Sequence, residues 1–458
     1  NDRIAILLPN CREFALSYFA NSLIGATSVP INPSYHEKDI KYILEATGAR
    51  LVVTDSRHRD TVSRNYKIDG GAIYVVDFFL KSAGKPPAKG ARKSFEFNAI
   101  SDEDIAVISY TSGTTANPKG VKVSYGSIIA NAGEFIAALQ LDGDSVFYCP
   151  LSLAYMAGWY NLLFLPFLCR GRVVIDSTFN AGSLFTFWDN VIKYKVNVLW
   201  VVPTIMAILL AYKNDKAAEY CRVNIKSGLV GTAPLAALLK KKFEEEFHMT
   251  LYENYGLSEL LFITTNHPRL PYKESSVGKP LKGCRIFILN DDGGECGPGE
   301  EGEIVIESGY AMKGYYGKED EPAGRFINGR FYTGDMGKTD KDGYLFITGR
   351  KKDLIIKGGV NISPRAIEDV LLKYDPVQEA AVIGMRNEIY GEEIIAVIKL
   401  KDKHKRLYDE KKISEFCESS LARHQQPARF IVIDEMPKTA SGKIQKDKLK
   451  ILLARVTA

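Results

Sequence analysis

Short apolar runs alternate with helix-length segments through the first half of the chain. Residues 3–8, 28–31 and 50–54 read as strands, and segments with helical periodicity separate them. Strands that alternate with helices at this spacing form βαβ units, in which neighbouring strands run parallel. The same alternation returns between residues 173 and 247. We therefore expect an α/β fold in which a large N-terminal body contains parallel-rich sheets.

The pattern changes after residue 275, where short predicted strands are separated by Gly-rich turns. This part is expected to form a small β subdomain. Helices and strands then alternate again on a smaller scale, which predicts a compact α+β domain at the C-terminus. The charged segment 349–353 is the natural joint between the two parts. The sequence thus predicts a large N-terminal body at 1–349, a hinge at 350–353 and a small C-terminal domain at 354–458.

Composition places the chain among ordinary globular proteins and argues against several other classes. Hydrophobic residues make up 46% and charged residues 25% of the 458 positions, which is not the pattern of disordered, collagen-like or coiled-coil chains. A net charge of +5 is small for this length and does not indicate a nucleic-acid partner. The longest apolar stretches contain proline and fall short of the ~18 residues of a membrane span, so no transmembrane segment is expected.

Cysteine usage favours a reducing compartment such as the cytoplasm. The seven cysteines are odd in number and no pair has C-x-x-C spacing, which argues against a disulfide framework and against a zinc site. The chain opens with Asn1 directly before a predicted strand, so we expect that a further segment precedes it.

The segment 110–120, Tyr-Thr-Ser-Gly-Thr-Thr-Ala-Asn-Pro-Lys-Gly, is the strongest local motif. It follows a predicted strand at 105–109 and precedes a predicted helix at 125–139. Consecutive hydroxyl and glycine positions form a flexible loop whose amides and hydroxyls can surround phosphate oxygens. Lys119 adds a positive charge for a β- or γ-phosphate. The loop is not a Walker A motif, because Lys119 precedes Gly120 and no hydroxyl follows. An ordinary polar turn from strand to helix is the alternative.

With this loop and several later motifs, the sequence resembles the adenylate-forming superfamily of acyl-CoA synthetases, nonribosomal adenylation domains and luciferases. The sequence is most similar to acyl- or aryl-CoA ligases within this superfamily, and the resemblance covers nearly the whole chain. Six motifs in family order leave little room for coincidence. Those after the loop are Gly-Thr-Ala-Pro-Leu at 231–235, Tyr-Glu-Asn-Tyr-Gly-Leu-Ser-Glu at 252–259, Tyr-Thr-Gly-Asp at 332–335, Gly-Arg-Lys-Lys-Asp at 349–353 and Pro-Lys-Thr-Ala-Ser-Gly-Lys-Ile at 437–444.

The resemblance implies an ATP-dependent acid–thiol ligase. A free carboxylate resists attack by a thiol because it is anionic and lacks a leaving group, whereas a mixed anhydride with AMP carries a good one. To form that anhydride, the carboxylate attacks the α-phosphate of ATP, so positive charge and a metal are needed. The implied cofactors are ATP, Mg²⁺ and coenzyme A, and the acid is expected to be fatty or aryl. A phosphopantetheine arm on an acyl carrier protein, or a non-catalytic nucleotide-binding relative, are the alternatives.

The resemblance also implies roles for single residues. Glu259 is the expected Mg²⁺ ligand, and Lys443 is expected to reach the carboxylate and α-phosphate oxygens. Asp335 would accept hydrogen bonds from the ribose hydroxyls, Tyr255 would stack on adenine, and Arg350 would support ribose or phosphate. The catalytic candidates are Lys443, Glu259, Thr114 and Lys119. The expected ATP- or AMP-binding residues are Thr111, Ser112, Gly113, Thr114, Thr115, Lys119, Thr232, Ala233, Pro234, Glu253, Asn254, Tyr255, Gly256, Ser258, Asp335, Ile347, Arg350 and Lys443.

Two half-reactions with different needs share one site in enzymes of this kind. The resemblance implies that the small domain rotates about Lys352 between them, which is gating by domain closure. Rotation would withdraw Lys443 and bring Lys357, Gly358 and Gly359 toward the site. A backbone without Cβ atoms would let a slim thiol arm pass there.

The acid pocket departs from the family pattern. Tyr155 stands where most relatives have histidine, three residues before Gly158. Tyrosine titrates near 10 rather than near 7, so Tyr155 is expected to gate or contact the carboxylate without acid–base chemistry, with core packing as the alternative. No Asp or Glu stands nearby to hold an α-amino group, which favours an apolar acid over an amino acid. The expected acid-pocket residues are Tyr155, Trp159, Gly231 and Leu261.

Overall fold

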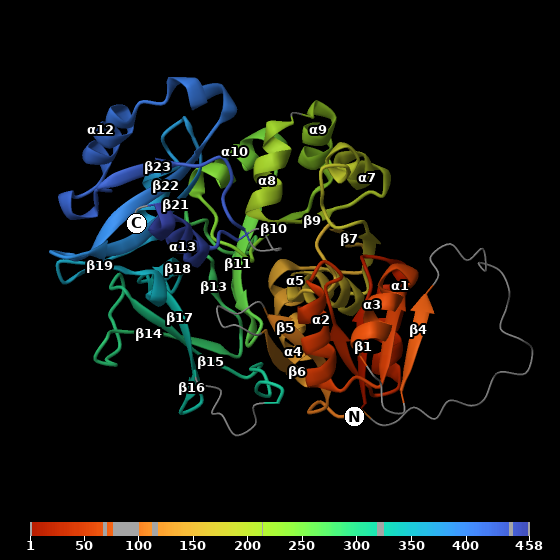
Figure 1. Ribbon diagram of the computed structural model, residues 1–458. Helices are drawn as coiled ribbons and strands as arrows, with labels where there is room; N and C mark the ends of the chain where they lie inside the picture. The colour runs from red at the N-terminus through yellow and green to blue at the C-terminus, as the bar shows by residue number, and fades with distance from the viewer. Residues whose placement is uncertain are drawn as a thin grey trace, which may run out of the picture.

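Parallel strands build the first sheet of the large body (Figure 1). The computed structural model describes residues 2–66, 71–76, 100–111, 118–212, 214–317, 325–438 and 443–456. The strand order is β4-β3-β1-β2-β5-β6, and β1 pairs in parallel with both β2 and β3. The strands are β1 (Arg3–Leu7), β2 (Thr27–Pro30), β3 (Leu51–Asp55), β4 (Ala72–Val76), β5 (Ile105–Thr111) and β6 (Lys119–Ser124); α1 (Arg12–Leu23), α2 (Glu37–Thr47) and α3 (Ser56–Asn65) connect the first four. This confirms the predicted βαβ pattern.

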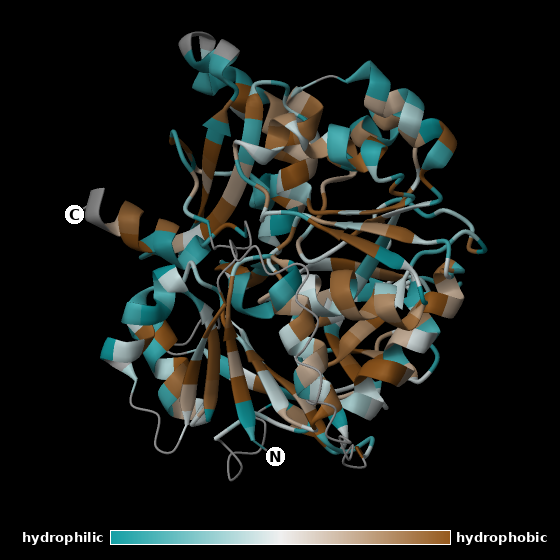
Figure 2. Ribbon diagram, turned by 90° about the vertical axis from the view of Figure 1, so that its right-hand side faces the viewer, coloured by the Kyte–Doolittle hydropathy of each residue, from teal (hydrophilic) through white to brown (hydrophobic). Residues whose placement is uncertain are grey.

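A second sheet follows with the order β13-β12-β11-β10-β9-β7-β8. Its strands from β7 to β11 pair in parallel, and β12 and β13 add antiparallel pairs. The strands are β7 (Val146–Cys149), β8 (Arg172–Ile175), β9 (Val198–Val201), β10 (Ser227–Val230), β11 (Leu251–Leu257), β12 (Leu261–Thr265) and β13 (Lys279–Pro280). The helices are α4 (Tyr125–Leu139), α5 (Met156–Trp159), the π-helix η1 (Tyr160–Phe164), α6 (Leu165–Leu168), η2 (Ser183–Phe185), α7 (Phe187–Lys193), α8 (Pro203–Ala211), α9 (Asp215–Asn224) and α10 (Ala237–Phe247). Hydrophobic residues concentrate along the strands and on the helices between the sheets (Figure 2).

Two antiparallel-rich sheets complete the chain. One contains β14 (Cys284–Leu289), β15 (Gly302–Ser308), β16 (Phe326–Ile327), β17 (Arg330–Thr339) and β18 (Leu345–Arg350), which form the predicted β subdomain. The other contains β19 (Ile355–Lys357), β20 (Val360–Ile362), β21 (Val377–Asn387), β22 (Gly391–Leu400) and β23 (Arg429–Val432). Its short and long helices are η3 (Lys351–Asp353), α11 (Pro364–Leu371), η4 (Asp402–Leu407), α12 (Glu410–Ser420), η5 (Arg423–Gln425) and α13 (Lys446–Val456). The small α+β C-terminal part has its own apolar core, as the fold prediction required.

The segment after the phosphate loop contains a strand that the sequence did not predict. β6 pairs antiparallel with β5, with Thr111 opposite Lys119. Helix α4 spans Tyr125–Leu139, as predicted, and the Ser124 side chain caps its first turn. The loop residues therefore lie between two paired strands, β5 and β6. Ser112, Gly113, Thr114 and Thr115 lie outside the described residues.

Within the described residues, no helix is both long enough and apolar enough to cross a bilayer.

Candidate functional site

Three predicted nucleotide-binding residues meet where β17 and β18 pair. Asp335 lies opposite Arg350 in the register and is buried. The Arg350 Nε atom lies 2.7 Å from Asp335 Oδ1, and the Tyr255 hydroxyl donates to Asp335 Oδ2 at 2.6 Å. Burial, reinforced by the Asp335 carboxylate, raises the pKa of Tyr255 well above its usual range. Tyr255 therefore stays a neutral donor that fixes the orientation of Asp335.

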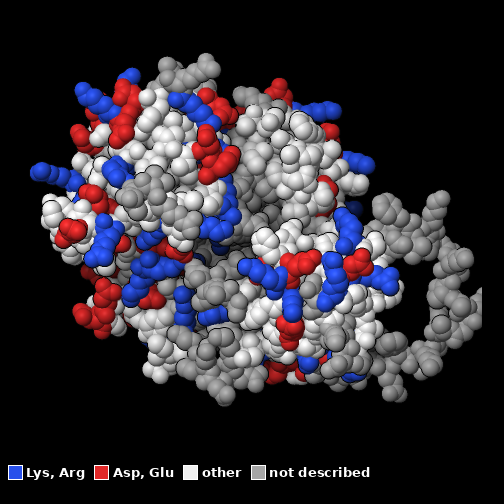
Figure 3. Space-filling model, in the orientation of Figure 1, with Lys and Arg blue, Asp and Glu red and all other residues white. Residues whose placement is uncertain are grey.

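Lys443 of the C-terminal part joins this group. Surrounding protein atoms lower the pKa of its ammonium group by desolvation, the Arg350 guanidinium lowers that pKa further, and the Asp335 carboxylate opposes both. The residue nevertheless keeps solvent contact, so protein encloses the ammonium group without sealing it from water. Figure 3 shows a hollow between the C-terminal part and the large body, with Lys and Arg side chains around it. The structure thus brings together residues that lie about a hundred positions apart in the chain.

Tyr315 organises a second group of predicted residues. Its hydroxyl donates to Glu259 Oε1 at 2.9 Å, and Lys119 Nζ lies 5.2 Å from the centroid of its ring. The backbones are joined as well, because the Met312 amide donates to the Glu259 carbonyl at 2.8 Å and Val121 forms a bridge with Tyr315. The predicted metal ligand and the predicted phosphate-loop lysine therefore share one tyrosine, which the sequence analysis did not single out.

The donor set at Glu259 fits a magnesium ion that phosphates bring with them. Mg²⁺ is usually held by one or two carboxylates together with substrate phosphates and water. Glu259 is half-buried and directs a carboxylate oxygen to Tyr315. Over the ranges that the structure describes, no group of three or more His, Cys, Asp or Glu side chains forms a cage for a metal. A single carboxylate that shares Tyr315 with Lys119 fits such an ion.

Glu253 takes part in a buried ion pair that the sequence analysis missed. Lys240 Nζ on α10 lies 3.0 Å from Glu253 Oε1, and both side chains are less than a tenth exposed. Burial raises the pKa of Glu253, and Lys240 opposes this shift. The ring of Tyr272 lies 4.8 Å from the same ammonium group. The side chain predicted to contact the nucleotide is thus already engaged within the large body.

The turn at 231–234 exposes two of its residues. Asn254 Nδ2 donates to the Val230 carbonyl at 3.0 Å. A Cβ atom on Gly231 would lie 2.4 Å from Asn254 Oδ1, so only glycine fits beside that amide. Thr232 adopts a left-handed φ of 71° and, like Pro234, is exposed. Thr232 and Pro234 are therefore accessible to a flat base.

The four predicted acid-pocket residues divide into two kinds. Tyr155 is half-buried and contacts Tyr35 edge to face, with ring centroids 6.2 Å apart. Trp159 is fully buried and stacks on Tyr18 at 6.0 Å. Leu261 is also fully buried, and Gly231 has no side chain to offer. Tyr155 is therefore the only side chain of the four that solvent, and hence a substrate, reaches in this structure.

Comparisons with known proteins identify the family. The model of the AMP-binding enzyme family matches residues 1–316, and the model of the AMP-binding enzyme C-terminal domain matches residues 366–443. The chain belongs to the AMP-binding enzyme family. This confirms the family resemblance that the motifs indicated.

Relatives of this AMP-binding enzyme align over nearly its whole length. The long-chain-fatty-acid–CoA ligase of Bacillus subtilis (strain 168) is 30% identical over 98% of this chain and 85% of its own. The oxalate–CoA ligase of Arabidopsis thaliana is 30% identical over 97% and 87%. The structure of ATP-bound MatB from Rhodopseudomonas palustris superposes with a TM-score of 0.90 at 26% identity, over 100% of this chain and 90% of that one. The structure of MenE from Bacillus subtilis with ATP and a magnesium ion gives 0.84 at 29% identity, over 98% and 89%.

Two features of this AMP-binding enzyme follow its β subdomain: the joint at Lys352 and the glycine turn at 358–359. Lys352, on η3, places its Nζ atom 3.7 Å from Asp447 Oδ2 on α13. Gly358 and Gly359 have φ values of 60° and 81° at the exposed turn between β19 and β20. The Gly358 amide donates to the Tyr390 carbonyl at 2.8 Å, so this turn packs on its own sheet in the arrangement observed.

The remaining predicted residues lie on strands and turns next to the site. Gly256 lies against the Leu261 carbonyl, where a Cβ atom would come within 2.4 Å. Ser258 and Ile347 are half-buried, and Ile347 pairs with Gly337 within the β subdomain. Thr111 ends β5, directly opposite Lys119. These residues shape the backbone around the site.

Proposed function

We propose that the chain activates a carboxylic acid with ATP to an acyl-adenylate, releases pyrophosphate, and transfers the acyl group to coenzyme A. The observation that carries this proposal is the position of Lys443 beside Arg350 and Asp335. It supplies positive charge from the C-terminal part at a nucleotide site built by the large body. The names of the curated relatives, which include long-chain-fatty-acid–CoA, oxalate–CoA and 2-succinylbenzoate–CoA ligases, support the same reaction class.

Asp335 would hold the ribose of the nucleotide. Its two oxygens are fixed by Arg350 Nε and by the Tyr255 hydroxyl, yet a carboxylate has further lone pairs that can accept from the 2′- and 3′-hydroxyls. The turn at 231–234, with Thr232 and Pro234 exposed, would lie against the base. Fixing the nucleoside in this way places the α-phosphate near Lys443.

Lys443 would stabilise the negative charge that develops when the carboxylate attacks the α-phosphate. Preorganised positive groups in a partly enclosed site stabilise such charge more strongly than water does. Lys119 and the loop at 112–117 would hold the phosphates that leave. Glu259, oriented by Tyr315, would hold Mg²⁺, and the ion when bound neutralises phosphate charge.

The C-terminal part would then rotate for the thiol step. We place the adenylation core at 1–349, the hinge at 350–353 and the lid domain at 354–458. In the observed arrangement, the Ser363 hydroxyl on the C-terminal side donates to the Thr348 carbonyl at 2.6 Å across the joint. Breaking this contact and turning about Lys352 would withdraw Lys443 and present Lys357, Gly358 and Gly359.

Coenzyme A is the acceptor that the relatives' names favour, and an acyl carrier protein with the same thiol is the second candidate. The seven cysteines are all free thiols, which supports a cytoplasmic setting. A non-catalytic role is disfavoured because Lys443, Glu259 and Asp335 are all retained and positioned.

The deciding experiment is acid-dependent ATP–pyrophosphate exchange across fatty, aryl and amino acids. An acid that supports exchange is then tested for acyl transfer to coenzyme A and, in parallel, to a phosphopantetheinylated carrier protein. Exchange with at least one acid and thioester formation with coenzyme A are expected. Nucleotide binding without exchange for any acid would overturn the proposal.

A further inference from the structure

Partly exposed residues next to the nucleotide motif give way to fully buried residues further inside. Tyr155, Met156 and Leu257 keep partial solvent contact, so their side chains are accessible to a bound acid. Further inside, Phe262 is paired directly with Gly256 of the nucleotide motif in the register of β11 and β12. An acid that extends inward past Gly256 therefore meets the Phe262 segment.

Four aromatic side chains fill the interior at this point, and we call them the aromatic wall: Phe135, Tyr160, Trp200 and Phe262. Phe135 and Phe262 stack with ring centroids 3.8 Å apart. Trp200 lies 5.9 Å from Phe135 and 5.7 Å from Phe262, and Tyr160 lies 5.1 Å from Phe262. Each of the four residues is at most 2% exposed. Rings at these separations are packed as in a protein interior and leave no width for an acyl chain between them.

Asn131 fixes the aromatic wall in place. This fully buried residue donates from Nδ2 to the Phe262 carbonyl at 2.8 Å. Its Oδ1 atom accepts from the Phe262 amide at 3.0 Å and from the Tyr160 hydroxyl at 2.7 Å. Tyr160 begins the π-helix η1, a rare local geometry that often marks functional regions. One side chain thus joins α4, β12 and η1, and moving the Phe262 backbone or the Tyr160 ring would break these buried hydrogen bonds.

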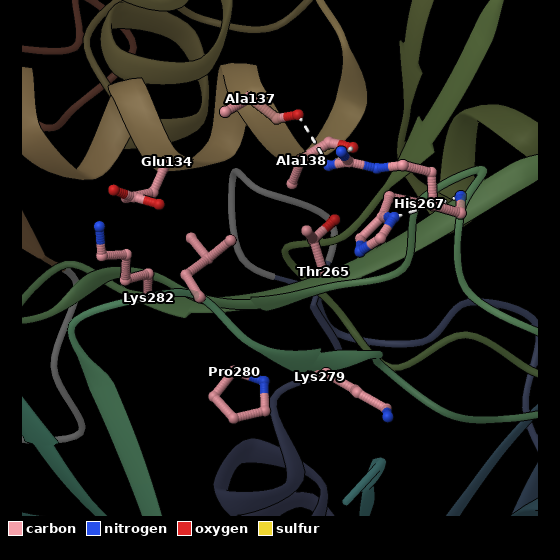
Figure 4. Close-up of a pocket in the computed structure, with 10 residues that line it drawn as sticks. Glu134, Ala137, Ala138, Thr265, His267, Lys279, Pro280 and Lys282 are labelled. Carbon is pink, nitrogen blue, oxygen red and sulfur yellow. Dashed lines mark hydrogen bonds between the residues drawn. The ribbon is translucent and has the colours of Figure 1, made fainter.

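A pocket opens between α4 and the β12–β13 segment, and its lining mixes charged and apolar residues (Figure 4). Glu134 and Lys282 lie at one end, and His267 and Thr265 at the other. Its volume of about 190 Å³ is below the ~300–1,000 Å³ of typical small-molecule sites. The pocket is thus too small to hold a long fatty chain.

We propose that the aromatic wall closes the acid pocket from the inside, so that the substrate class is short-chain or single-ring carboxylic acids. This inference rests on the proposed acid–CoA ligase function and narrows the fatty or aryl acid expected from the sequence. The relatives' names do not indicate the size of the acid, since they include both oxalate–CoA and long-chain-fatty-acid–CoA ligases. The stacked rings of the aromatic wall are the observation that favours a small acid.

The test compares acids of increasing length on the wild-type protein. Acid-dependent pyrophosphate release is measured for acetate, butanoate, hexanoate, benzoate, decanoate and hexadecanoate. Affinity is measured separately by calorimetry with sulfamoyl-adenosine conjugates of the same acids, which need no turnover. We expect kcat/KM and affinity to fall steeply beyond hexanoate, since each misfitting methylene typically costs about 10-fold or more.

Highest kcat/KM with decanoate or hexadecanoate would overturn the inference and leave the ligase function standing. Absence of release with every acid, with no conjugate bound, would instead overturn the ligase function itself.

Variants of the aromatic wall assign the limit to these rings. Phe135→Leu and Phe262→Leu should raise the ratio of kcat/KM for decanoate over butanoate by about 10-fold, with a parallel change in conjugate affinity. Phe243→Leu is the matched control, because Phe243 is equally buried but belongs to a different core cluster, and its ratio should not change. An unchanged ratio in both wall variants would overturn the assignment. Folding of each variant is checked by its binding of the sulfamoyl-adenosine conjugates of the short acids.

Discussion

Lys443 brings a positive charge from the C-terminal part to the group formed by Arg350 and Asp335. Its ammonium group lies beside Arg350 and Asp335, and its pKa is lowered chiefly by the surrounding protein. Lys443→Ala should slow adenylation by ~10²–10³, equivalent to about 3–4 kcal/mol. Thioester formation from a supplied acyl-adenylate should be largely retained. Pyrophosphate release and acyl-CoA formation measure the two steps, and Lys448→Ala, an exposed lysine on α13, is the control. Equal loss in both steps would contradict the assignment.

The buried pair Lys240–Glu253 predicts a pH-dependent stability defect. Lys240→Met leaves Glu253 as an uncompensated buried charge, a change that typically costs about 3–5 kcal/mol. The folded-state pKa of Glu253, already raised by burial, should rise further without Lys240. Because the folded state then binds a proton more tightly than the unfolded state, stability should recover as the pH falls through that raised pKa.

Urea denaturation near neutral pH and near the raised Glu253 pKa tests this dependence. The double variant Lys240→Met with Glu253→Gln is the control, and it should be more stable at neutral pH than the single variant. Equal stability of single and double variants at both pH values would show that the pair is not coupled.

At the scale of elements, the sequence predicted the strands and motif residues that a local pattern marks. It missed the residues whose role depends on contacts with distant parts of the chain. Strands such as β9 are continuous apolar runs, and motif residues such as Asp335 could be named from their neighbours. Strand β6 was hidden because Lys119 and Gly120 read as loop. Tyr315 was missed because its contact with Glu259 spans 56 positions, and Asn131 because its contact with Phe262 spans 131. Contacts of that range leave no periodic signal in one sequence.

The stability of an Asn131 variant shows how much this side chain contributes to holding α4, β12 and η1 together. Asn131→Leu removes the partner of two Phe262 backbone groups and of the Tyr160 hydroxyl. A buried polar group left without a partner costs about 1–3 kcal/mol, so the urea midpoint should fall clearly. Asn224→Ala is the control, because that amide lies at an exposed helix end, where changes are usually within about 0.5 kcal/mol. A midpoint of Asn131→Leu equal to that of the control would contradict the role of this residue.

At the scale of the whole molecule, the proposed function implies that the observed arrangement serves adenylation and that the thiol step requires another. Lys352 lies at the joint, and its ion pair with Asp447 is exposed on both sides, so the pair itself contributes little. Lys352→Pro should therefore act through the backbone, because proline fixes φ near −65° and restricts rotation. We expect the thioester step to slow more than adenylation, measured as acyl-CoA formation from a supplied acyl-adenylate against pyrophosphate release. Lys352→Ala removes the same ion pair without restricting φ and should leave both rates near those of the wild type. If the proline and alanine variants form thioester at the same rate, the rotation does not pass through this residue.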